Sequence, residues 1–100
     1  MRVAVDLCLI PIGVGVSLSK HVAVAIEVLR DKGLSPRTHA HGTSLEGEYS
    51  EIFAALEEAI AAVHAAGAPR VSTSIKLSSR IDRPQSDAEK MESIERRLRS

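Results

Sequence analysis

The sequence predicts an α+β fold in which four strands form one antiparallel sheet and two helices cover a single face of it. Segments with strand periodicity and segments with helix periodicity follow one another in the order strand, helix, strand, strand, helix, strand. This order is that of the split βαβ fold, and a short helix is expected after the fourth strand. Because 100 residues are typical of one domain, we expect residues 1–100 to fold as a single unit.

Four segments alternate between apolar and small or polar side chains, as half-buried strands do. They are residues 1–10, 34–41, 44–48 and 71–77. Proline and glycine at positions 11–15 are expected to end the first strand. Gly42 and Thr43 are expected to connect the second strand to the third.

Helical spacing of apolar side chains predicts helices over residues 18–32 and 51–66. Ser17 or Ser19 can cap the first helix, and Gly33 ends it. Ser50 can cap the second, which stops at Gly67-Ala68-Pro69. The sequence Ser86-Asp87-Ala88-Glu89 has the form of a capping box and predicts the short C-terminal helix. The charges from Glu89 to Arg99 are typical of a solvated helix face.

Composition argues against several functional classes. The chain has 13 basic and 13 acidic residues, so no net field attracts it to nucleic acid or to an anionic membrane. Its two aromatic residues, Tyr49 and Phe53, give no platform for stacking bases. The single Cys8 cannot form an internal disulfide, and no secretion leader is recognisable, so we expect a cytoplasmic protein. Cys8 itself is expected to be a small buried residue.

The split βαβ order leaves one face of the sheet without helices. On the adjacent first and fourth strands, this face is expected to carry small or mixed-polarity side chains, namely Ala4, Asp6, Cys8, Ser72, Ser74 and Lys76. Such a face can pack against another subunit or line a ligand pocket, with Asp6 and Lys76 as a candidate ion pair. An exposed antiparallel face that tolerates Ser and Lys is an equally open interpretation.

Three segments carry a resemblance to a known family. The first strand leads into Pro11-Ile12-Gly13 and a serine-rich helix start, and a Gly-Thr-x-x-Glu-Gly-Glu sequence covers residues 42–48. An Arg-Val-x-Thr-x-Ile-Lys strand covers residues 70–76 and is followed by Arg80-x-Asp82. Together these motifs resemble the thiamine-binding protein family of ferredoxin-like proteins, and the likeness covers essentially the whole chain. His21 and His41 depart from the family pattern, in which Tyr and Met are common at the corresponding positions.

The resemblance implies a non-enzymatic protein that binds thiamine or its hydroxymethylpyrimidine half without a cofactor. It also implies a homo-oligomer, either a dimer or a tetramer, with the pocket near a subunit interface. An aminopyrimidine needs a carboxylate to accept from its exocyclic amine and hydroxyls to bind its ring nitrogens, and a cationic thiazolium favours further carboxylates. The ligand-binding residues expected on these grounds are Asp6, Ser17, Ser19, Thr43, Glu46 and Gly47.

Other interpretations of the same residues stay open. Thr43 to Glu48 can be a hairpin strand with a charged edge and no ligand. Gly13-Val14-Gly15 is not a dinucleotide or phosphate loop, because Leu18 stands in the third glycine's place and no Gly-Lys-Ser/Thr follows.

The histidines suggest a third interpretation. His39 and His41 lie two apart on a predicted strand, so they are expected to share a face and could hold a divalent metal with Glu46 or Glu48. No nucleophile, base and orienting group can be recognised, so no catalytic residue is predicted and an enzyme ranks last. The leading hypothesis is a small-molecule binding protein, and its rival is an interaction or regulatory subunit whose exposed sheet face binds a partner protein.

Overall fold

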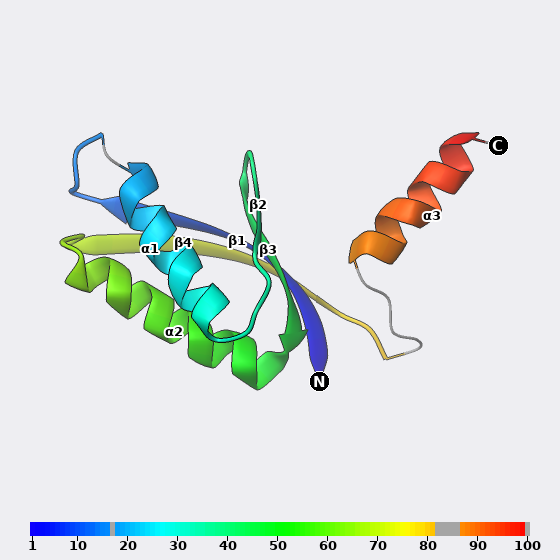
Figure 1. Cartoon of the computed structure of the whole chain (residues 1–100), viewed down its shortest axis with the longest axis horizontal. Coiled ribbons are helices and arrows are strands. Elements are labelled where there is room, and N and C mark those ends of the chain that lie inside the picture. Colours follow the sequence, from blue (N-terminus) through cyan, green and yellow to red (C-terminus); the bar gives the residue numbers. More distant parts are fainter. Residues whose placement is uncertain (17, 82–86, 100) are drawn as a thin grey trace.

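Figure 1 shows the computed structural model, which describes residues 1–16, 18–81 and 87–99. The elements in chain order are β1 (Arg2–Ile12), α1 (Leu18–Asp31), β2 (Arg37–His39), β3 (Gly42–Glu48), α2 (Tyr49–Ala65), β4 (Arg70–Ser79) and α3 (Asp87–Arg99). The strands form one antiparallel sheet in the order β2-β3-β1-β4. Helices α1 and α2 lie together on one side of this sheet. The predicted split βαβ fold with a C-terminal helix is confirmed.

Strand β1 is central, and its alternation builds the core. Val3, Val5, Leu7 and Leu9 are buried, whereas the residues between them are only half-buried. The buried side chains face α1 and α2, which contribute Ala25, Leu29, Ile52, Ala55, Leu56, Ala59 and Val63 to the same cluster. Leu45 of β3 and Ala68, which precedes β4, complete it. The apolar period of each element therefore determines which face it turns to the core.

Strand β1 continues through Pro11, which was expected to end it. The prediction was wrong because Pro11 lies where β1 has only one neighbouring strand. β3 pairs with β1 from Arg2 to Leu7, and beyond Leu7 only β4 remains, with Val71 opposite Pro11. A proline is tolerated where its missing N–H would face no partner strand. The turn comes at Gly13, whose φ of 87° and close approach to the Pro69 ring exclude a side chain.

Two other predicted boundaries were wrong. Gly42 and Thr43 belong to β3, and the hairpin turn is Ala40-His41 instead. Ser50 does not cap α2, because the helix begins at Tyr49 and Glu48 holds the N-cap position without a side-chain cap bond. The Tyr49 N–H donates to the Met1 carbonyl at 2.8 Å, which satisfies one of the helix's first donors. Gly33 ends α1 as predicted, with a φ of 81°.

Helix α3 stands apart from the two helices that cover the sheet (Figure 1). It presents an apolar stripe to solvent, in which Met91, Ile94 and Leu98 are 63%, 52% and 80% exposed. The capping residue proposed for it, Ser86, lies outside the described residues, as do Ser17 and Asp82. Within the described part of the chain, no helix combines the length and apolarity needed to cross a bilayer.

Thr73 on β4 allows the free-energy cost of an unpaired buried hydroxyl to be measured. Its hydroxyl oxygen is buried and makes no hydrogen bond with the residues that the structure describes. Because an unpaired buried hydroxyl is penalised, Thr73→Val should raise the free energy of unfolding by about 1 kcal/mol. Urea denaturation at one protein concentration measures this, with Thr38→Val on the exposed strand β2 as the matched control. A loss of stability in Thr73→Val would show that the hydroxyl has a stabilising partner.

Candidate functional site

The face of the sheet away from α1 and α2, called here the open face, carries a polar cluster drawn from several strands. Ala4, Asp6 and Cys8 of β1 lie directly opposite Ser78, Lys76 and Ser74 of β4, and directly opposed residues point to the same side. On the other flank of β1, Ser44 and Glu46 of β3 lie opposite Asp6 and Ala4. The expected sharing of this face by Ala4, Asp6, Cys8, Ser72, Ser74 and Lys76 is confirmed. Cys8 was expected to be a small buried residue, and the structure leaves it half-buried on this face.

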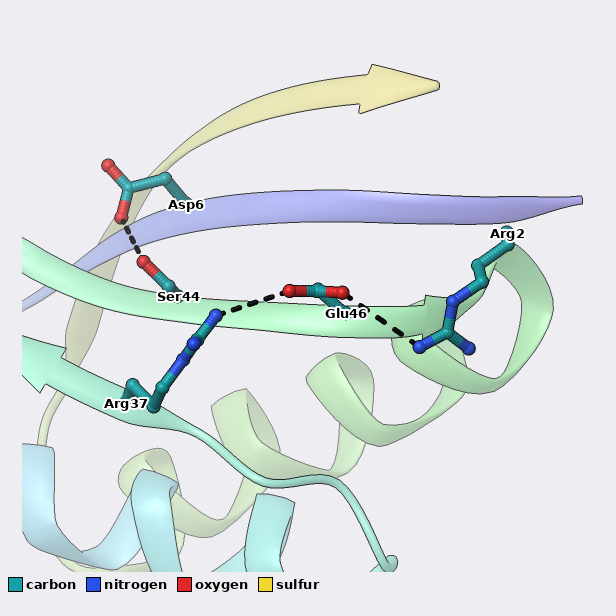
Figure 2. A network of polar contacts seen from close by, with 5 residues as sticks. All are labelled: Arg2, Asp6, Arg37, Ser44 and Glu46. Carbon is teal, nitrogen blue, oxygen red and sulfur yellow. Dashed lines mark hydrogen bonds and ion pairs between the residues drawn. The ribbon is translucent and has the colours of Figure 1, made fainter. Parts of the chain in front are cut away.

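Glu46 is the most enclosed carboxylate of the open-face cluster. Its side chain is only 16% exposed, and its Oε1 lies 3.2 Å from Arg37 Nη2 on β2. Its Oε2 lies 3.9 Å from Arg2 Nη2 on β1. Figure 2 shows Glu46 between the two guanidinium groups. The two cations compensate the cost of partly burying this carboxylate, and they hold its orientation.

Asp6 forms a second polar group on the same face. Its Oδ1 lies 2.7 Å from His39 Nε2. The Ser44 hydroxyl donates to the same oxygen at 3.5 Å, the contact drawn in Figure 2. Lys76 is opposite Asp6 in the strand register, but the Asp6 carboxylate contacts His39 and Ser44. The candidate Asp6–Lys76 ion pair is therefore replaced by contacts to β2 and β3.

The ring of His39 is held from both sides. The backbone N–H of His41 donates to its Nδ1 at 3.2 Å, so Nδ1 is an acceptor and the proton sits on Nε2, which donates to Asp6. His41 lies in the turn beyond β2, so the prediction that His39 and His41 share a strand face was wrong. Among the described residues, no group of three or more His, Cys, Asp or Glu side chains is placed to hold a metal ion.

Two adjoining hollows lie over the open face. One, of about 460 Å³, is lined by Asp6, Ser44 and Lys76. The other, of about 300 Å³, is lined by Arg2, Glu46 and Arg80. Both share Ala4, Ser78 and Lys90, so the small Ala4 side chain forms a common floor and α3 contributes a cation. Carboxylates, hydroxyls and cations therefore surround these two hollows.

Of the six residues expected to bind a ligand, Asp6 and Glu46 line the two adjoining hollows of the open face. Glu46 also lines, together with Gly47, a hollow of about 470 Å³ beside the loop that precedes β2. Thr43 and Gly47 lie on the opposite, helix-covered face, where Thr43 is 5% exposed and Gly47 packs beneath Leu34 and Ile52. Ser19 lies in the first turn of α1, on the helix side of the sheet, and Ser17 is outside the described residues. The two-residue period of β3 is what places Thr43 and Gly47 on one face and Glu46 on the other.

Sequence reasoning missed Ser44 and Arg37, which do contribute to the open-face cluster. Ser44 could have been found because it lies two residues from Glu46 on the same strand and therefore points to the same face. Arg37 could have been found from the hairpin, because antiparallel pairing places it opposite Ser44. Thr43 instead lines a separate hollow of about 370 Å³ between α1 and the β2–β3 hairpin.

Two histidines are used to hold the end of α2. His21 of α1 is 7% exposed, and its Nε2 donates to the Ala66 carbonyl at 3.3 Å. His64 Nδ1 donates to the Ala68 carbonyl at 2.8 Å. The first contact satisfies the carbonyl at the C-cap of α2, and the second satisfies a carbonyl in the turn that follows the helix. His21, which departs from the family pattern, therefore has a structural role in packing α1 against α2.

Comparison with known proteins identifies the family to which this chain belongs. A family model described as "Thiamine-binding protein" matches residues 5–95. The chain belongs to the thiamine-binding protein family. A relative from Synechocystis, named only as a UPF0045 protein, is 48% identical over 95 residues, which cover 95% of this chain and 78% of the relative. A UPF0045 protein of Mycobacterium tuberculosis is 39% identical over 99 residues, 98% of this chain and 96% of the relative.

Solved structures agree with this membership of the thiamine-binding protein family. A hypothetical protein from Methanocaldococcus jannaschii superposes with a TM-score of 0.85 at 37% identity, covering 94% of this chain and 96% of that one. A Thermotoga maritima protein, described as a candidate thiamine biosynthesis or salvage protein, has a TM-score of 0.81 over 94% of this chain and 99% of its own. At 20% identity the second likeness shows the shared fold only.

Gly42 at the start of β3 offers a test of how the hairpin is placed against β1. A Cβ atom at this position would lie 2.5 Å from the Leu7 carbonyl oxygen, which is a backbone atom and cannot move aside. Gly42→Ala should therefore lower the free energy of unfolding by about 2 kcal/mol. In the same strand, Gly47→Ala meets its nearest atom at 3.5 Å and is the matched control, with a much smaller loss. Equal losses in the two variants would contradict the close approach.

Proposed function

We propose that this protein binds thiamine or its hydroxymethylpyrimidine half without catalysing a reaction, and that the ligand occupies the open-face hollows beside Asp6, Ser44 and Glu46. The observation that carries the proposal is the half-buried Glu46 carboxylate, held between Arg37 and Arg2 at the wall of a hollow. Membership of the thiamine-binding protein family supports the choice of ligand.

The chemistry of an aminopyrimidine agrees with this arrangement. A carboxylate has about four lone-pair positions, so Glu46 can accept from an exocyclic amine while it keeps its contacts with the two arginines. The Ser44 and Ser78 hydroxyls can donate to ring nitrogens or accept from a hydroxymethyl group. Ala4 gives a flat ring a small apolar surface to lie on. For whole thiamine, Asp6 supplies a negative charge for the thiazolium ring.

Assembly and location are part of the proposal. The hollows are shallow and lie on the face of the sheet that neither α1 nor α2 covers. We therefore propose that a second copy of the chain covers the ligand in a homo-oligomer. Enclosure by a second copy would offset the lack of aromatic stacking partners. We place the protein in the cytoplasm, for which the single, unbridged Cys8 is the support.

One observation favours a second candidate, an interaction or regulatory subunit without a small ligand. Ile10 and Ile12 continue the open face toward the far end of β1 and are 45% and 39% exposed. Exposed apolar side chains at the end of a polar face are suited to contact with another protein. The ligand titration described next separates the two candidates.

Isothermal titration of the full chain with thiamine and with hydroxymethylpyrimidine tests the leading proposal. Heat of binding is expected with at least one of them. Glu46→Gln should weaken that binding by roughly tenfold or more, because the negative charge and one of the two acceptor oxygens are lost. Glu57→Gln, at an exposed position of α2, is the matched control and should bind as the wild type does. Circular dichroism of each variant checks that its fold is intact.

Two outcomes would contradict the proposal at different levels. Absence of heat with both compounds would favour the interaction subunit. Binding that survives Glu46→Gln but is lost in Thr43→Val would place the ligand in the hollow between α1 and the β2–β3 hairpin, on the helix side of the sheet.

A further inference from the structure

Lys76 lies on the open face and has no ionic partner among the residues that the structure describes. It is opposite Asp6 in the strand register, but the Asp6 carboxylate contacts His39 and Ser44 instead. Lys90 of α3 lines the same hollow of about 460 Å³, and it too takes part in no ion pair within the described part of the chain. Two ammonium groups therefore border one hollow without a carboxylate bound to either.

Cations outnumber carboxylates around the two open-face hollows taken together. The cationic side chains that line them are Arg2, Lys76, Arg80 and Lys90, and the carboxylates are Asp6 and Glu46. Glu46 also has a partner outside this set, since Arg37 Nη2 lies 3.2 Å from its Oε1. The lining therefore carries a surplus of positive charge at neutral pH, and a concave site with such a surplus attracts an anion.

Hydroxyl groups accompany the two ammonium groups. Ser78 is two residues beyond Lys76 on β4, so both side chains point to the open face, and Ser78 lines both hollows. Ser44 lines the hollow of Lys76 from the β3 side. A phosphate monoester carries a charge of about −1.5 to −2 at pH 7 and three strong acceptor oxygens. Ammonium and hydroxyl groups are the donors that such a group needs.

We propose that Lys76, Lys90 and Ser78 form a subsite for a phosphate group, so that the open face prefers a phosphate monoester of thiamine or of hydroxymethylpyrimidine to the free alcohol. The choice of these esters rests on the proposed function, which places the pyrimidine ring on Ala4 beside Glu46. Ala4 has Glu46 opposite it on β3 and Ser78 opposite it on β4. The ring then lies between a carboxylate that accepts from its amine and the donors that bind the phosphate.

The kind of cation agrees with a phosphate group. Lysine binds phosphate as a point charge, whereas arginine gives a carboxylate a planar, bidentate partner. Lys76 and Lys90 come from β4 and α3, so they can approach different oxygens of one phosphate group. A phosphate monoester is close to a dianion at neutral pH, and it therefore offsets more of the surplus positive charge than a single carboxylate would.

Isothermal titration of the full chain compares each ester with its own alcohol, namely thiamine monophosphate with thiamine and hydroxymethylpyrimidine phosphate with hydroxymethylpyrimidine. At a low ionic strength of about 50 mM, the ester is expected to bind roughly tenfold more tightly than the alcohol. Lys76→Met removes the ammonium group but keeps a long side chain, and it should lower this ratio of affinities to about one. Lys90→Met, on a different element, should lower the ratio in the same direction. Lys20→Met, at an exposed position of α1, removes the same charge and is the matched control, in which the ratio is retained.

A titration with inorganic phosphate, followed by the amide chemical shifts of the full chain, tests the subsite without the organic part of the ligand. Shifts are expected around Lys76 and Ser78 in the wild type and should be absent in Lys76→Met.

Equal affinities for ester and alcohol, or a preference that survives both Lys76→Met and Lys90→Met, would overturn the phosphate subsite and leave the proposed function intact. Absence of heat with every organic compound would instead contradict the proposed function, and the inorganic titration then decides the subsite by itself. Shifts around Ser78 that are lost in Lys76→Met would support it, and a wild type without such shifts would overturn it.

Discussion

The alternation of β1 is the constraint on which the rest of the structure depends. As the central strand it has β3 on one side and β4 on the other, and its odd-numbered residues Val3, Val5, Leu7 and Leu9 must all be buried against α1 and α2. Slipping the strand by one residue would expose this apolar set and bury Asp6 in its place. Because neighbouring strands follow the register of β1, its core face also determines which residues of β3 and β4 reach the open face.

The open face shows how polar groups are kept on a half-covered sheet. The enclosed Glu46 has guanidinium groups from two different strands, and the more exposed Asp6 has an imidazole and a hydroxyl. Neither carboxylate depends on a residue near it in sequence. Such a cluster contributes less to stability than the apolar side does, since partly exposed ion pairs are weak. The ligand site proposed above would make use of this arrangement.

The errors of sequence reasoning have particular physical causes. Element order and core faces could be predicted, because apolar periodicity reports burial directly. The expected connection at Gly42-Thr43 was wrong because turn-forming residue types also occur where a strand needs a close backbone approach, as Gly42 does against Leu7. The expected ligand residues were taken from a continuous motif, but strand alternation separates Thr43 and Gly47 from Glu46. Arg37 and Ser44 were missed because hairpin register, which brings them to the same face, is set by the turn.

By itself, the sequence determined the order of strands and helices, the apolar face of each, and membership of the thiamine-binding protein family, because each of these is recorded in local spacing and residue type. Only the tertiary structure decided which polar residues meet. Arg2, Arg37 and Glu46 come from three strands, and their contacts depend on long-range pairing that no local pattern encodes. It also decided that β4 forms an edge with half of its apolar side uncovered, since an edge is defined by the absence of a neighbour in space.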